Sequence, residues 1–93
     1  MIVSVTTVKL YASWVHSLKE KRMVVKSLCE KLRGRFNISV IESSAQDVHQ
    51  TVIISFAFLS DNTSIADSIN DKIGRFIENN TDAEVVDIQT EQR

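Results

Sequence analysis

The 93-residue chain contains no proline, only two glycines and a single cysteine. It therefore has neither a proline-rich linker nor a glycine-rich loop of the kind that cradles phosphate groups. The single cysteine, Cys29, excludes an internal disulfide and is typical of the reducing cytoplasm, where we expect this protein to reside. No apolar run approaches the roughly 20 residues of a membrane-spanning helix. The start of the chain lacks the basic leader of a signal peptide, so we predict neither secretion nor membrane association.

The net charge of the chain is only −1, but its two halves carry opposite charges. Residues 1–35 carry eight basic and two acidic side chains, whereas residues 36–93 carry three basic and ten acidic ones. Seven of the eleven basic residues lie in the segment 17–35, SLKEKRMVVKSLCEKLRGR. This balance argues against coating of nucleic acid by the whole surface and predicts one local electrostatic contact.

The hydrophobic pattern predicts the element order β-α-β-β-α-β. Strands are indicated over 1–11, 35–44, 50–60 and 83–89, with a hairpin loop over 45–49. A helix should begin at Ser17, which precedes Glu20 in a capping box, and end at Gly34. A second helix follows the cap candidates at 61–64, with its apolar stripe at Ile65, Ile69, Ile73, Phe76 and Ile77.

This order is that of an α+β ferredoxin-like fold, a four-stranded antiparallel sheet with two helices on one face. At 93 residues we expect one domain over 1–93, with an ordered core over about 1–89 and a polar C-terminal tail.

The segment SLKEKR at 17–22, followed by VVKSL and then by RFNISV at 35–40, resembles the YlxP-like family of small bacterial proteins. That family is catalogued as a domain of unknown function, and the resemblance covers nearly the whole chain. It implies a ferredoxin-like fold in the bacterial cytoplasm and an RNA- or ribosome-related role, but no activity. The family's hairpin motif, His-Gln-Asp-Leu-Trp, is only partly kept here as residues 45–49, AQDVH.

One side of the first helix carries a row of cations that we call the basic ridge. At about 100° per residue its members fall within roughly 60° of one another. They are Lys19, Arg22, Lys26 and Arg33. Such a row can displace counterions from a nucleic-acid backbone. The structural alternative is a solvated face whose long stems cover apolar surface. Lys21 points toward the apolar stripe, so we expect it to pair with a carboxylate at the sheet edge.

The topology brings the loop after the first strand to the same end as the 45–49 hairpin. Ser17, Gln46 and Asp47 would shape this end of the site, helped by the positive helix N-terminus. The alternative is that Asp47 pairs with Lys21 or Arg22 and only ties the hairpin to the helix. His16, His49 and Asp47 could meet there, but we predict no metal, because two loop histidines are more often plain surface residues.

Three further features are assigned to the core or to an interface. Cys29 lies on the buried stripe and is expected to be inert. Phe56 and Phe58 share a strand face with Val52 and Ile54, so they predict core packing instead of base stacking. The open side of the sheet should hold a mixture of apolar and small residues suited to a homodimer. These residues are Val5, Thr7, Ser39, Ile41 and Ser55.

We therefore expect a non-enzymatic cytoplasmic protein that binds RNA or a ribosome-associated ribonucleoprotein through the basic ridge, without a cofactor. One alternative is a module that docks the ridge on an acidic protein partner. Another is a small-anion binder at the helix N-terminus and hairpin end. No activated nucleophile or acid–base pair can be assembled from the sequence, so we predict no catalytic residues.

Overall fold

A computed structural model describes all residues 1–93 and confirms the predicted order β-α-β-β-α-β. The strands are β1 (Ile2–Tyr11), β2 (Ser39–Ser44), β3 (Thr51–Ser60) and β4 (Glu84–Gln92). The helices are α1 (Leu18–Arg35) and α2 (Thr63–Asn80). Neither helix is long and apolar enough to cross a membrane.

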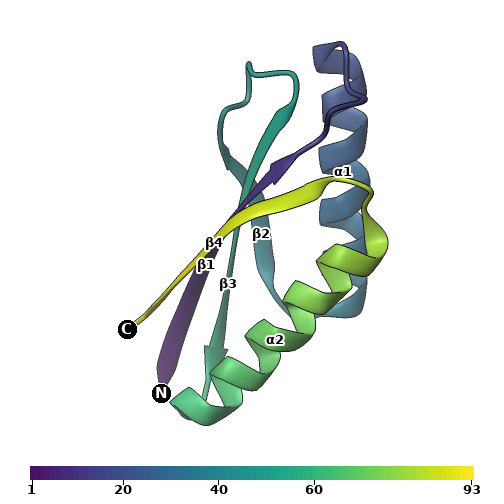
Figure 1. Cartoon of the computed structure of the whole chain (residues 1–93). Coiled ribbons are helices and arrows are strands. Elements are labelled where there is room, and N and C mark those ends of the chain that lie inside the picture. Colours follow the sequence, from purple (N-terminus) through teal and green to yellow (C-terminus); the bar gives the residue numbers. More distant parts are fainter.

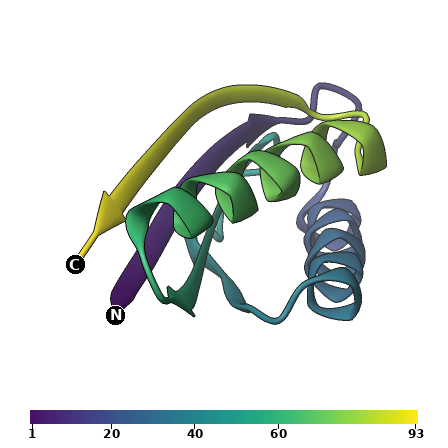
Figure 2. The same cartoon turned by 90° about the horizontal axis from the view of Figure 1, so that it is seen from below.

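The strands form one antiparallel sheet in the order β2-β3-β1-β4, so β2 and β4 are its edges (Figure 1). Both helices lie on the same side of this sheet and leave the other side open (Figure 2). This is the predicted α+β ferredoxin-like arrangement. Because β1 and β2 both run antiparallel to β3, the loop before α1 and the β2–β3 hairpin lie at the same end of the sheet.

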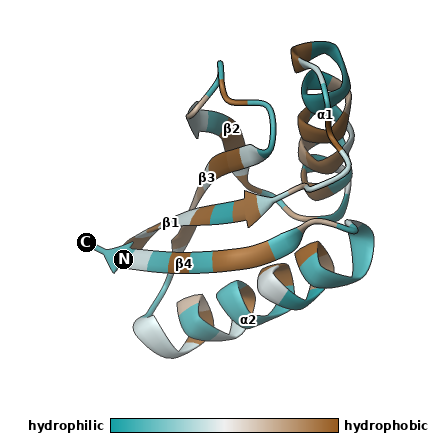
Figure 3. Ribbon diagram, turned by 45° about the horizontal axis from the view of Figure 1, so that its top comes forward, coloured by the Kyte–Doolittle hydropathy of each residue, from teal (hydrophilic) through white to brown (hydrophobic).

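The core lies between the helices and the sheet, where buried apolar residues of both layers form one cluster. Figure 3 shows hydrophobic residues, in brown, along the ribbons of both layers. Phe56 and Phe58 belong to this core, at 2% and 8% exposure, together with Val52 and Ile54. The prediction of core packing for these two aromatics is therefore confirmed. A base could not stack on either ring without displacing a helix.

Three element ends differ from the sequence pattern. β2 begins at Ser39 and not at residue 35, because residue 35 still belongs to α1. α1 continues through Gly34 to Arg35, because Gly34 lacks a positive φ and Phe36 provides the cap by donating its N–H to the Leu32 carbonyl. β4 continues to Gln92, and beyond it the backbone of Arg93 exchanges two hydrogen bonds with Val3. The polar tail is thus held as an edge strand.

The start of the α2 stripe was also predicted wrongly. Ile73 and Ile77 are fully buried, but Ile65 is 44% exposed beside Met1 and Leu59. The first turn of α2 extends past the end of the core, and Ala66 takes the buried position there. Asn62 is the residue that caps this helix, since its side chain accepts the Ile65 N–H at 2.9 Å.

Candidate nucleic-acid interface

Helix α1 is fixed at its start by the predicted cap and along its length by an apolar stripe. The Ser17 hydroxyl accepts the Glu20 N–H at 3.1 Å, which satisfies one free donor of the first turn. Val25, Leu28 and Leu32 are buried against the sheet. This packing fixes the rotation of the helix about its axis, and so determines which of its cations face water.

Lys21 is the one cation of α1 that is buried, at 1% exposure. Its Nζ atom donates to the Ala45 carbonyl and lies 3.0 Å from Glu42 Oε2, in the edge strand β2. The predicted pairing of Lys21 with a carboxylate at the sheet edge is confirmed. Glu42 Oε2 is buried and accepts no hydrogen bond, so the charge of Lys21 is its sole partner.

The alternative that Asp47 connects the hairpin to the helix was wrong, because other residues make this connection. Asp47 is exposed and forms no ion pair, whereas Glu42 and the Ala45 carbonyl make the connection. The signal in the sequence was the alternation of β2, which puts Glu42 on the same face as the buried Val40. A carboxylate at a core-facing strand position is costly to bury unless a cation pairs with it, so a cation is expected opposite Glu42.

The basic ridge lies on the exposed flank of α1, and all four of its residues are exposed. The protein has two ion pairs, Lys21–Glu42 and Arg93–Glu91, so no ridge cation lies within 4.0 Å of a carboxylate. Lys19, Arg22 and Lys26 also donate no hydrogen bond to the protein. Their charges are therefore available to a ligand.

Arg33 differs from the other ridge residues because it is anchored to the sheet. Its guanidinium donates to the Val40 carbonyl of β2 at 2.8 Å, while the residue as a whole stays exposed. A guanidinium has five N–H donors, so this bond leaves most of them free. The anchor holds Arg33 in a defined position at the end of the ridge.

Cys29 lies beside Arg33 but inside the core, at 4% exposure. Burial raises the pKa of its thiol, which the nearby Arg33 partly counteracts and Glu42 reinforces. A thiol with a raised pKa stays protonated and is a poor nucleophile. The assignment of Cys29 to the core is confirmed.

The hairpin end gathers some of the predicted residues and not others. His16, Asp47 and His49 line one recess of about 620 Å³ between the loop after β1 and the hairpin. Gln46 bonds only to the nearby Glu42 carbonyl, at 3.3 Å, and Ser17 is engaged in the cap. No group of three or more His, Cys, Asp or Glu side chains is arranged to hold a metal ion.

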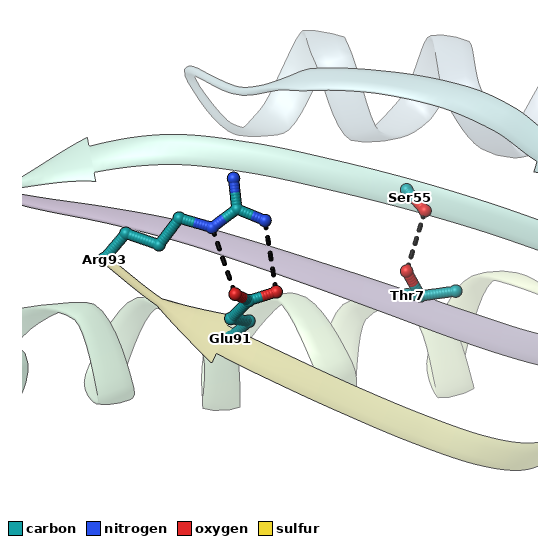
Figure 4. Close-up of polar contacts among 4 residues, drawn as sticks. All are labelled: Thr7, Ser55, Glu91 and Arg93. Atoms are coloured by element: carbon teal, nitrogen blue, oxygen red, sulfur yellow. Dashed lines mark hydrogen bonds and ion pairs between the residues drawn. The ribbon is translucent and has the colours of Figure 1, made fainter.

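The open side of the sheet carries a hydrogen-bonded chain of hydroxyls across three strands. Thr7 and Ser55 lie 2.8 Å apart (Figure 4), and Ser55 donates to Ser43 at 2.7 Å. Around this chain the strand registers place mainly apolar side chains, none of them fully buried. They are Val3, Val5, Ile41, Ile53, Ala57 and Leu59.

The same side is more polar toward β4. There the Arg93 guanidinium donates two hydrogen bonds of 3.1 Å to the Glu91 carboxylate, as Figure 4 shows. These bonds lower the pKa of Glu91 below its usual value. The apolar part of the open side is thus bordered by charge along one edge.

Comparison with known proteins matches the chain to one family. The family model for DUF503, described as a protein of unknown function, covers residues 3–90. No curated protein matches the chain.

Proposed function

The chain belongs to the DUF503 family, and we propose that it is a non-enzymatic cytoplasmic protein that binds RNA or a ribonucleoprotein through the basic ridge of α1. We also propose that it is a YlxP-like protein, a proposal that its SLKEKR segment supports. The free, buried Cys29 is consistent with a reducing compartment.

One observation carries this proposal: the ridge is uncompensated in a protein that has twelve acidic side chains. Solvated helices commonly pair their charges four residues apart, which stabilises the helix by a few tenths of a kcal/mol. Glu30 lies four residues after Lys26, yet the two form no ion pair. Exposed cations that are left free along one helix flank suit the regular spacing of backbone phosphates.

The test is binding of fluorescently labelled RNA, measured by anisotropy as a function of salt. If all four cations contact phosphates, the slope of log K against log salt is about −2.8 for a single strand. The double variant Arg22→Glu/Lys26→Glu should abolish binding. Both side chains are exposed and form no hydrogen bond or ion pair within the protein, so we expect the fold to be unaffected.

The matched control is a pair of single variants on the same helix. Lys26→Glu changes the ridge, whereas Lys31→Glu makes the same charge change off the ridge. At physiological salt the Debye length is about 8 Å, so a remote charge has little effect. Equal losses from the two variants would show non-specific attraction. RNA binding that neither variant weakens would contradict RNA as the ligand of the ridge. So would a protein partner that the ridge retains after nuclease treatment. In either case the proposed ligand would be an acidic protein surface.

We further propose that two copies of the chain associate through the open side of the sheet. The hydroxyls of Thr7, Ser55 and Ser43 bond to one another, so burying them leaves few donors unsatisfied. The four strands have 10, 6, 10 and 9 residues and present a face of roughly 560 Å² at about 3.3 Å per residue and 4.8 Å per strand. This approaches the roughly 800 Å² per partner of a standard interface.

Light scattering after size exclusion tests the dimer. We expect twice the 10.5 kDa mass of one chain, and we expect Ile41→Lys to give the monomer. Met23→Lys is the control, because Met23 is comparably exposed but lies on α1. A wild-type monomer, or a dimer that Ile41→Lys leaves intact, would remove the proposal.

A further inference from the structure

A second group of cations lies between the end of α1 and the middle of α2, around a recess of about 280 Å³. Arg35 comes from the last position of α1, and Lys72 and Arg75 from successive turns of α2. Phe36 and Phe76 complete the lining, which contains no carboxylate. Figure 1 shows the lower end of α1 beside α2. We call this the interhelical recess.

This cluster of cations cannot be recognised in the sequence, because Arg35 lies in the basic half of the chain whereas Lys72 and Arg75 lie in the acidic half. Residues 36–93 contain three basic side chains, and two of them, Lys72 and Arg75, lie beside Arg35. None of these three cations belongs to either ion pair of the protein. Asp71 and Glu78 of α2 line a neighbouring recess together with Arg75 but form no ion pair with it. Within the interhelical recess the three like charges therefore repel one another unless an anion joins them.

Helix electrostatics explain only one of the three cations. A basic residue in the last turn of a helix interacts favourably with the helix dipole, which accounts for Arg35. Lys72 and Arg75 lie in the interior of α2, where the dipole effect has faded. They make no hydrogen bond that would assign them a structural task within the protein.

The two aromatic rings give the recess a rigid floor. Phe36 and Phe76 meet edge to face, with centroids 5.4 Å apart and planes at 89°. The Arg35 guanidinium carbon lies 6.0 Å from the Phe36 centroid, within reach of a cation–π contact. Packing of this kind restricts the flexible arginine at the lining of the recess.

We propose that the interhelical recess binds a phosphate-bearing small molecule, of the size of pyrophosphate or a mononucleotide. Two guanidinium groups can each clamp a phosphate with paired N–H donors, and an ammonium adds a point charge. The recess volume of about 280 Å³ lies just below the range of roughly 300–1,000 Å³ for drug-sized ligands, so it suits a smaller molecule. Arg35 points roughly 170° away from the centre of the ridge, so this site is independent of the proposed RNA surface.

Titration of the whole protein with inorganic pyrophosphate, and separately with AMP, tests the proposal through backbone amide chemical shifts. We expect saturable shifts confined to the Arg35–Phe36 junction and to residues 72–76 of α2. Lys72→Gln and Arg75→Gln should each weaken binding roughly tenfold, as expected for loss of one charge-assisted bond. Lys26→Gln, which removes a cation from the ridge, is the matched control and should leave both dissociation constants unchanged.

Three results would overturn the proposal. The first is a set of shifts that spreads equally over the ridge, which indicates general attraction of anions. The second is an unchanged affinity in both α2 variants while their spectra show an intact fold. The third is dependence of RNA binding, but not of pyrophosphate or AMP binding, on Lys72 and Arg75. That last outcome would make the recess part of the nucleic-acid surface.

Discussion

The two helices of this protein have the same length and the same structural task, but they differ in charge. Each has 18 residues and packs an apolar stripe on the same side of one sheet. α1 carries seven basic and two acidic residues, whereas α2 carries two basic and three acidic ones. Because both helices have the same role in packing, the fold does not explain why α1 carries so many basic residues.

Only one cation of α1, Lys21, is buried by the packing, although Arg33 also donates a hydrogen bond to the Val40 carbonyl of β2. Lys21 is buried against β2, whereas the ridge residues Lys19, Arg22 and Lys26 form no ion pair and no hydrogen bond within the protein. On α2, the buried positions Ala66, Ile73 and Ile77 are all apolar. Comparison of the helices thus separates a structural cation from those left free for a partner.

The largest effect is expected from Lys21→Ala, which should lower the free energy of unfolding by about 3 to 5 kcal/mol. The substitution leaves the buried Oε2 atom of Glu42 without its only partner and removes the donor to the Ala45 carbonyl. Urea unfolding measures the difference. Lys31→Ala, on the same helix but exposed, should change stability by less than about 0.5 kcal/mol.

A second variant isolates the charge from the packing. Lys21→Met/Glu42→Leu replaces the ion pair by apolar side chains of similar size and should recover most of the lost stability. If Lys21→Ala and Lys31→Ala had equal effects, the distinction between a structural cation and free cations on α1 would be lost.

The sequence was sufficient for the fold and for the direction of the ridge, because both follow from periodicity. Alternation in β1 and β3, and the spacing of Val25, Leu28 and Leu32, fix the layers and hence the exposed flank of α1. Contacts between elements could not be predicted in this way. The choice of Glu42 over Asp47 depends on the β2–β3 register, which contains a bulge between Glu42 and Ser44.

The interhelical recess is a second example of a contact between elements that could not be predicted from the sequence. Arg35 and Arg75 lie 40 positions apart in the sequence, and periodicity gives no information on how two helices cross. Their approach follows from the edge-to-face contact of Phe36 with Phe76, which depends on the packed core. Local patterns therefore predict a surface on one element but miss a site that two elements form together.

An effect of intermediate size compares the two helix starts. Ser17→Ala and Asn62→Ala each remove a side chain that accepts a backbone N–H, from Glu20 and Ile65. Each should lower the free energy of unfolding by about 1 kcal/mol. Thermal melts followed by circular dichroism measure both variants, with Ser68→Ala in the exposed part of α2 as the control. A neutral Asn62→Ala would mean that Thr63 or Ser64 can cap α2 instead.

The smallest effect compares the two glycines, one in each helix. A Cβ atom at Gly34 or at Gly74 would meet nothing within 4 Å, so alanine fits at both positions. Gly74 lies in the interior of α2, where Gly→Ala should raise the free energy of unfolding by about 0.8 kcal/mol. Gly34 is the penultimate residue of α1, where the helix frays, so its gain should be roughly half as large. Urea unfolding of the two variants ranks the gains. A loss of stability in Gly74→Ala would mean that the surroundings of Gly74 are more closely packed than the open space that the structure shows there. Equal gains would mean that the end of α1 is as firmly helical as the middle of α2.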